Sequence, residues 1–177
     1  MNILFLVSSL SFGGAEKQAI IDANLLSRDN TVFLASFFDG PKLKLINKRV
    51  NYIRIFKGGY LKTSKILAEI CIESEIDIVH ASLFAPCIIS ALSSVISKVP
   101  TIWHIHSHEY DSPLPSRLAF RFLAKLHSVR KILFVNHELL GHFSIYNFPK
   151  AKQGVLYNHS ILNSTLVQSK KKQKMVL

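Results

Sequence analysis

Three histidines alternate near the middle of the chain and form its densest group of residues that could do chemistry. His104, His106 and His108 would project to one side of an extended segment, because side chains two residues apart in a strand share a face. With Glu109 and Asp111 close by, such a run could bind zinc, for which imidazole and carboxylate groups are usual ligands.

A zinc site is nevertheless not the interpretation that the spacing favours. The run lacks the acid of the metallohydrolase pattern His-x-His-x-Asp-His, and no second ligand cluster is evident. The histidines that could complete a site are scattered along the chain at His80, His137 and His142. We therefore expect no metal site, keep a histidine-ligated metal hydrolase as an alternative, and interpret His104 and His108 as structural or surface residues.

A pair of glycines follows the first apolar run. Gly13 and Gly14 precede a predicted helix, where backbone N–H groups can bind an anion or sugar hydroxyls, and Glu16 in the first turn suits the helix dipole. The dinucleotide-binding fingerprint requires a different spacing and a third glycine. A nucleotide-dependent reductase, with Asp39 holding a ribose, is thus disfavoured.

A basic stripe marks the helix that the pattern predicts over 115–127. Arg117, Arg121 and Lys125 are spaced four residues apart, so they share one side of that helix. The apolar residues beside them are Leu118, Phe120, Phe122, Leu123 and Leu126. A basic amphipathic helix with aromatic residues fits an anchor to anionic lipids, and it equally fits a helix with one core-facing and one solvated side.

These residues must be positioned by elements that alternate in type along the chain. Strands are predicted at 3–7, 31–38, 50–56, 77–80, 100–106, 131–135 and 154–157, and helices at 15–27, 62–73, 86–97, 115–127 and 137–146. Such alternation predicts an α/β fold with a doubly wound, mostly parallel, Rossmann-like sheet. Ligands of such sheets bind beyond the carboxyl ends of the strands, which selects the loops at 8–14, 80–85, 106–111 and 136–138.

Length and charge limit the classes of function. The 177 residues make about one domain, and 49% apolar with 19% charged residues excludes global disorder. The net charge of +11 is uneven: residues 42–65 hold eight bases and no acid, and residues 112–177 hold eleven bases and one acid. An anionic partner is expected, and a membrane surface is favoured over nucleic acid because no nucleic-acid-binding motif is present.

Cysteine usage and hydropathy indicate the compartment. Cys71 and Cys87 are too few and too far apart for a disulfide framework, which fits a reducing compartment. The first ten residues lack the basic region of a signal peptide, and no apolar run reaches the roughly 18 residues of a membrane span. We expect a cytoplasmic chain, with peripheral attachment at the inner face of the membrane as an option.

Five short segments, in order, resemble those of a known family. They are Asn2–Leu10 followed by Gly13-Gly14-Ala15-Glu16; Asp77-Ile-Val-His80; Val99-Pro100 with Ile105-His106; Lys131–Asn136; and Val155-Leu-Tyr-Asn158, where His159 replaces a glycine. Together they are similar to the first domain of glycosyltransferase family 4, the retaining sugar-nucleotide transferases of GT-B fold. The resemblance runs from residue 2 to about residue 163.

The resemblance implies a division of the chain. Residues 1–165 would be the N-terminal, acceptor-binding half of a GT-B fold, and residues 166–177 a linker and the start of a truncated donor-binding domain. It further implies a UDP- or GDP-sugar donor with no cofactor, a glycan or lipid-linked acceptor in polysaccharide or lipopolysaccharide assembly, and no activity of this chain alone. A stand-alone module that binds anionic lipid or glycan remains the alternative.

The same resemblance assigns roles to residues. His106 would face the reacting sugar as the catalytic residue. The residues expected to border the acceptor and the cleft are Gly13, Gly14, Glu16, His80 and Asn136.

Overall fold

The computed structural model describes residues 1–11, 13–56, 58–108 and 114–158. The strands in this part are β1 (Asn2–Ser9), β2 (Thr31–Phe38), β3 (Val50–Arg54), β4 (Ile78–Ser82), β5 (Thr101–Ile105), β6 (Val129–Phe134) and β7 (Gln153–Val155). The α-helices are α1 (Gly14–Leu26), α2 (Tyr60–Glu73), α3 (Phe84–Ser97), α4 (Leu114–Leu123) and α5 (His137–His142). Short 3₁₀ helices occupy Pro41–Leu45, Phe143–Tyr146 and Lys150–Lys152.

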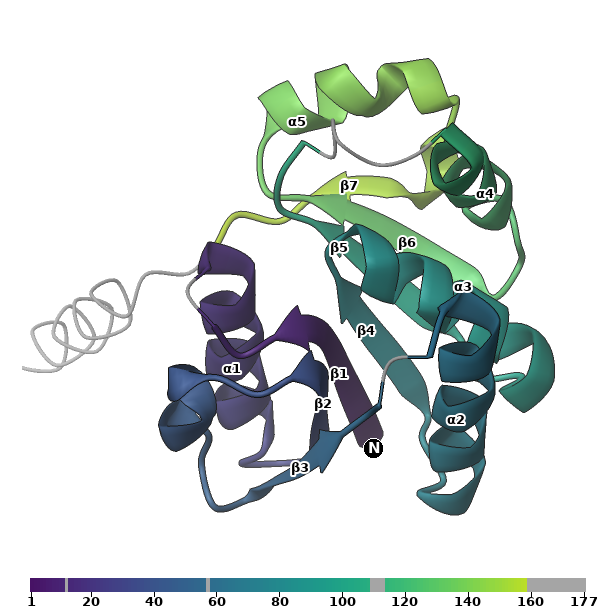
Figure 1. The fold of residues 1–177 in the computed structure, drawn as a ribbon. Coiled ribbons are helices and arrows are strands. Elements are labelled where there is room, and N and C mark those ends of the chain that lie inside the picture. The colour runs from purple at the N-terminus through teal and green to yellow at the C-terminus, as the bar shows by residue number, and fades with distance from the viewer. Residues whose placement is uncertain (12, 57, 109–113, 159–177) are drawn as a thin grey trace, which may run out of the picture.

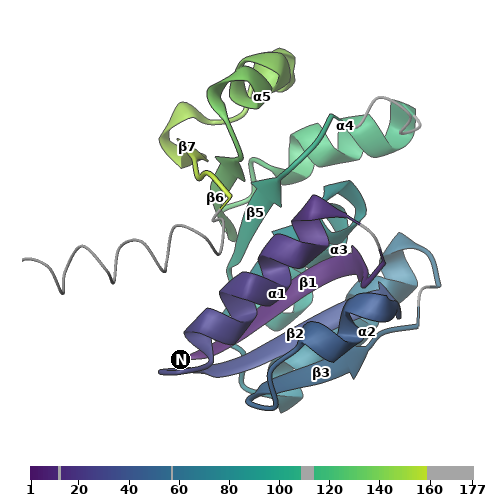
Figure 2. The same ribbon diagram turned by 90° about the vertical axis from the view of Figure 1, so that its left-hand side faces the viewer.

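The strands form one parallel sheet in the order β3-β2-β1-β4-β5-β6-β7 (Figure 1). Helix α1 packs on one face, while α2, α3 and α4 lie on the other (Figure 2). The predicted doubly wound α/β fold is therefore confirmed, and every strand pair in the described residues is parallel rather than only most of them.

Two hydrophobic cores, one on each side of the sheet, explain why β1 is a continuous apolar run. Phe5 and Val7 point to the core beneath α1, whereas Leu4 and Leu6 point to the core beneath α2 and α3. A strand with both faces covered needs apolar side chains at every position. The larger core also holds Phe120, whose ring stacks at centroid distances of 4.5 Å on Phe84 and 4.6 Å on Trp103 and fastens α4 to the sheet.

Helix ends are where the sequence pattern and the structure differ most. The helix predicted over 115–127 ends at Leu123, because the amides of Lys125 and Leu126 bond to carbonyls three residues back and tighten the chain into a turn. The helix predicted over 137–146 contains Gly141, a poor helix former, and changes to a 3₁₀ helix at Phe143.

Two further points concern the expected compartment and domain boundary. No helix of the described residues is long and apolar enough to cross a membrane. Cys71 and Cys87 are buried and form no disulfide within the described residues, and burial raises the pKa of the Cys71 thiol to about 12, so it behaves as an apolar side chain. The predicted linker and start of a second domain at 166–177 lie outside the described residues.

Candidate functional site

The carboxyl ends of the parallel strands meet at one edge of the sheet. β1 and β4 are neighbours there, and beyond them the chain proceeds outward in opposite directions, which is the switch point where ligands of such sheets bind. The four loops selected from the sequence follow β1, β4, β5 and β6, so the fold brings them to this edge. Residues 12 and 109–111 of these loops lie outside the described residues.

Three histidine rings form a continuous cluster next to the switch point. The rings of His80 and His104 lie 5.4 Å apart between centroids, and those of His104 and His106 lie 4.0 Å apart. Phe5 of β1 meets the ring of His80 edge-on at 5.1 Å. His80 lies on β4 and His104 lies 24 residues later on the neighbouring strand β5, so the order of the strands brings these histidines together.

Burial sets the charge of this cluster. Removal from water is the main cause that lowers the pKa of His80 to about 3, that of His104 to about 4 and that of His106 to about 3, and neighbouring imidazoles contribute to the low values of His80 and His106. The three rings are therefore neutral near pH 7, and each can both donate and accept a hydrogen bond. The cluster can orient hydroxyl groups but supplies no full positive charge.

The remaining histidine pair does not extend this cluster into a metal site. His108 packs against His142 of α5, with ring centroids 4.2 Å apart. Within the described residues, no three histidine, cysteine or acidic side chains are grouped as metal ligands would be. Glu109 and Asp111, which the zinc alternative requires, fall outside that part of the chain.

Gly13 and Gly14 stand at the start of α1, and an added side chain would have different consequences at the two positions. A side chain at Gly13 would overlap the Glu16 carboxylate, which folds back over the N-terminus of the helix, whereas a Cβ at Gly14 meets no described atom within 4 Å. The ammonium group of Lys42 donates to the carbonyl of Gly13 and holds the loop in place. Because a carboxylate already covers this end of the helix, the site suits a sugar hydroxyl better than a second anion.

Asn136, which follows β6, stabilises the start of α5. Its Oδ1 accepts a 2.7 Å hydrogen bond from the amide of Leu139, which makes Asn136 the N-cap of α5. Asn136 thus lies at the predicted edge of the sheet, and its side-chain oxygen is already used in a hydrogen bond that stabilises the start of α5.

The basic stripe predicted at Arg117, Arg121 and Lys125 is only partly on the helix and is not uniformly solvated, because α4 ends at Leu123 and Lys125 lies in the turn after it. Arg117 is half-buried and donates from Nε to the hydroxyl of Tyr146 at 3.2 Å, whereas the ammonium group of Lys125 lies 5.9 Å from the ring centre of Phe122. Leu114, Leu118 and Phe122, four residues apart, are exposed along the same helix.

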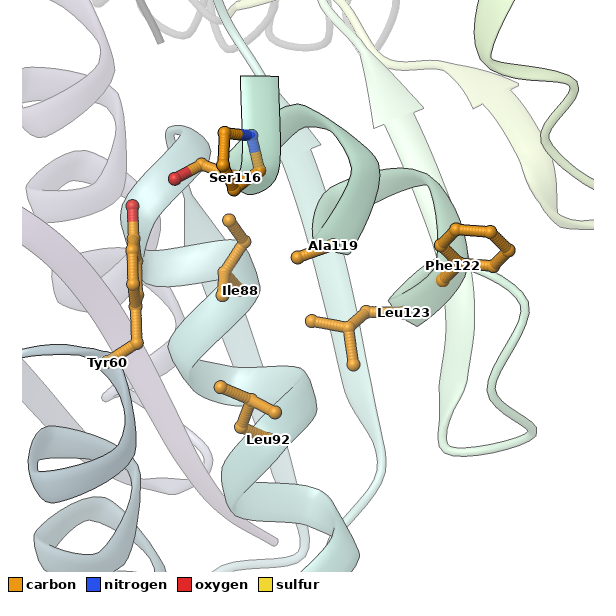
Figure 3. A pocket seen from close by; sticks show the side chains of 8 residues that line it. Tyr60, Ile88, Leu92, Ser116, Ala119, Phe122 and Leu123 are labelled. Atoms are coloured by element: carbon orange, nitrogen blue, oxygen red, sulfur yellow. The ribbon is translucent and has the colours of Figure 1, made fainter. Parts of the chain in front are cut away.

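An apolar groove of about 350 Å³ lies beside this stripe, between α3 and α4 (Figure 3). Ile88 and Leu92 of α3 face Ala119 and Leu123 of α4 across it, and Tyr60 closes the side toward α2. The groove joins the exposed apolar side of α4, so the two features form one surface.

Two features at the edge of the sheet were not predicted from the sequence. Leu83, between β4 and α3, has a φ of +75°, a backbone conformation that usually needs glycine, and its residue type gives no signal of this. Asp39 accepts hydrogen bonds from Tyr52 and Arg54, so the residue considered for a ribose is occupied in a side-chain network.

Comparison with known proteins agrees with this geometry. Residues 12–159 match the model of Glycosyltransferase Family 4. The structure of HepE from Anabaena in complex with UDP-glucose matches with a TM-score of 0.78 at 19% identity, over 99% of this chain and 50% of that one. A glycosyltransferase from Rickettsia africae matches with a TM-score of 0.68 at 20% identity, over 97% and 49% of the two chains.

A third structure and the extent of the matches complete the comparison. The lipopolysaccharide outer core galactosyltransferase WaaB matches with a TM-score of 0.64 at 13% identity, over 90% of this chain and 46% of that one. The chain therefore spans about half the length of these structures, and at such identities the likeness establishes the fold alone. No curated protein sequence matches the chain.

Proposed function

Because the chain belongs to glycosyltransferase family 4, we propose that it is the acceptor-binding domain of a retaining glycosyltransferase. In the complete enzyme, an acceptor hydroxyl oxygen bonds to the anomeric carbon of the donor sugar. The bond from that carbon to the phosphate oxygen breaks, the departing nucleoside diphosphate takes up the proton of the acceptor hydroxyl, and the anomeric configuration is kept. A UDP- or GDP-sugar is the donor, an assignment supported by neighbours whose crystals contain UDP and UDP-glucose.

The observation that carries this proposal is the arrangement at the switch point. The open space above Gly14 and the imidazole of His106 follow β1 and β5, which are separated by two strand spacings, or roughly 10 Å. In this proposal a sugar ring lies between them, and the Glu16 carboxylate accepts a hydrogen bond from a hydroxyl at one end. His80 and His104 stand behind His106 and keep its surroundings poor in water.

His106 would act through hydrogen bonds rather than through charge. Burial holds its pKa at about 3, so the ring stays neutral, and one nitrogen can donate while the other accepts. A fixed dipole aimed at the sugar stabilises charge as the bond to phosphate loosens, without any reorganisation of solvent. In the proposed mechanism His106 is the catalytic residue, and Gly13, His80 and Asn136 complete the borders of the site.

Transfer also needs a donor-binding half. Residues 1–165 provide the acceptor half in this proposal, and 166–177 lead into a second domain that binds the nucleotide sugar. Support comes from the coverage, since this chain matches only about half of each structural neighbour. Residues 1–177 alone should therefore not catalyse transfer.

The acceptor is proposed to be a glycan on a lipid, met at the inner face of the membrane during lipopolysaccharide or polysaccharide assembly. Exposed Leu118 and Phe122 beside basic Arg121 and Lys125 have the composition of an interfacial helix, and the groove next to them offers apolar surface for lipid. The WaaB neighbour, a lipopolysaccharide galactosyltransferase, supports the same class of acceptor.

Sugar transfer by the complete gene product tests the function. Radiolabelled UDP-glucose, UDP-galactose and GDP-mannose are each incubated with a lipid-linked glycan extract, and NMR of the product reads the anomeric configuration. We expect transfer with retention, a loss of about 100-fold in kcat for His106→Ala, and no turnover by residues 1–177. Transfer by residues 1–177 alone, or full activity of His106→Ala, contradicts the proposal.

Co-sedimentation with vesicles tests the membrane surface. Phe122→Asp should reduce binding of the chain to phosphatidylglycerol vesicles several-fold, while Phe56→Asp, which changes an exposed phenylalanine in the segment after β3, should not. If both variants bind the vesicles equally well, α4 is not the membrane contact. Vesicle binding by a complete gene product with no affinity for any nucleotide sugar would instead support the stand-alone lipid-binding module.

A further inference from the structure

Two exposed aromatic rings flank an arginine where β2 and β3 end. The guanidinium carbon of Arg54 lies 5.9 Å from the ring centre of Phe38 and 5.7 Å from that of Phe56. Phe38 is 52% exposed and Phe56 is 77% exposed, although exposed phenylalanine rings are unfavourable in water. We call Phe38, Asp39, Arg54 and Phe56 the aromatic platform.

Hydrogen bonds connect the polar side chains of the platform. The Asp39 carboxylate accepts from Arg54 Nη1 and from the hydroxyl of Tyr52, which is also 2.8 Å from the hydroxyl of Ser36. Burial and the bond to Asp39 raise the pKa of the Tyr52 phenol, which therefore stays protonated. Since the side chains of Arg54 and Asp39 are still 32% and 53% exposed, both can bond to a ligand without leaving each other.

Sugar chemistry matches this combination. A pyranose presents an apolar face of C–H groups, which packs on an aromatic ring, and a rim of hydroxyls, which pair with carboxylate and guanidinium groups. A nucleic acid base could also stack on the rings, but its phosphates would meet the Asp39 carboxylate. A lipid surface is disfavoured as well, because the Arg54–Asp39 ion pair lies between the two rings and would have to lose water.

The platform is continuous with the candidate site. The amide of Leu10, in the loop after β1, donates to the carbonyl of Phe38 at 3.0 Å, and the amide of Lys42 donates to the carbonyl of Leu10 at 3.1 Å. Gly40 packs so closely on that carbonyl that a Cβ there would overlap it. Hydrogen bonds and close packing thus connect the platform to the loop that carries Gly13 and Gly14, so the two lie along one edge of the sheet.

The distance between the aromatic platform and His106 determines how long a ligand must be to contact both. β2 and β5 are three strand spacings apart in the sheet order, which is about 14 Å. A single sugar cannot touch the platform and His106 together, whereas an oligosaccharide can. We propose that the aromatic platform is a subsite for an inner sugar of an oligosaccharide acceptor whose reacting end lies at His106; the second half of this statement rests on the proposed function.

Glycan binding by the chain, measured without any donor, tests the subsite. Residues 1–177 are applied to an array of bacterial glycans one to six sugars long, and the best-bound glycan is titrated in solution. We expect glycans of three or more sugars to bind better than monosaccharides. Phe38→Ala and Phe56→Ala should each weaken binding about tenfold, as expected for the loss of one stacked ring.

The matched control is Ile72→Ala, which removes an apolar side chain that is 58% exposed near the end of α2, outside the proposed sites, and should leave glycan binding unchanged. Unchanged thermal melting of all variants shows that they are folded. Absence of glycan binding by the wild type, or equal binding by Phe56→Ala, overturns the subsite even if the complete gene product transfers sugar. Glycan binding that depends on Phe56 with no transfer by the complete gene product keeps the subsite and removes the proposed function.

Discussion

The neutral histidine cluster should make the domain sensitive to mild acid. Unfolding exposes His80, His104 and His106 to water, where an imidazole has a pKa near 6.5, whereas their pKa values in the folded protein are about 3, 4 and 3. The unfolded chain therefore binds more protons. The stability is fully present above pH 6.5 and is lost progressively as the pH falls toward 4.

The size of the effect follows from proton linkage. At pH 5 each ring is neutral in the folded state and almost fully protonated in the unfolded chain, which costs about 2 kcal/mol per ring relative to pH 7. The three rings together lower the free energy of unfolding by about 6 kcal/mol. Since small domains are stable by about 5–15 kcal/mol, the domain should be close to unfolding at pH 5.

Urea unfolding at pH 7, 6 and 5 measures this loss. Trp103, the one tryptophan of the sequence, is fully buried in the core between α3 and α4, so its fluorescence reports global unfolding. His106→Gln removes one of the three titrating rings and should lose about 2 kcal/mol less than the wild type between pH 7 and pH 5. His137→Gln, an exposed histidine at the start of α5, is the control and should lose as much as the wild type.

Two results would refute the reasoning. One is a free energy of unfolding that stays level in the wild type from pH 7 to pH 5. The other is the same acid loss in His106→Gln as in the wild type, which would place the acid sensitivity elsewhere in the chain.

Three further predictions concern packing and backbone. Phe120→Ala, which removes a ring buried between two others, should lower the free energy of unfolding by about 3–5 kcal/mol in urea, whereas exposed Phe122→Ala should change it little. Lys98→Gly should raise it by about 1 kcal/mol in thermal melts, because Lys98 caps α3 at a φ of +63°, and Lys98→Ala should give no such gain. Gly14→Ala should melt like the wild type yet lose sugar transfer in the complete gene product, because a Cβ there meets no described atom within 4 Å but occupies the space proposed for the sugar.

Much of the fold could be predicted because local patterns encode it. The β-branched and aromatic run predicted as a strand over 31–38 forms β2 with the same bounds, and it is followed by Asp39-Gly40-Pro41, residues that are typical of turns. The alternation of strands and helices also implied a parallel sheet, and a parallel sheet places the ends of all its strands at one edge. For that reason the Gly13–Gly14 loop and His106 could be assigned to one edge from the sequence.

Helix ends were less predictable, because they depend on weak local preferences and on packing. The last turn of α4 unwinds after Leu123, and the pattern at 137–146 divides at Phe143. The first change leaves Lys125 of the predicted basic stripe in the turn after the helix, whereas Gly13, Gly14, His106 and Asn136 lie at the predicted edge of the sheet.

The sequence by itself determined the order of elements, the class of fold and the edge at which the site residues gather. Only the tertiary structure decided which side chains meet: His80 with His104, Arg54 with Asp39 between two exposed rings, and Arg117 with Tyr146. The reason is that the spacing of apolar residues and the presence of turn-forming residues determine structure only over a few neighbouring positions in the chain. Contacts between strands depend on sheet order and register, which arise only when distant segments pack together and bury their apolar faces.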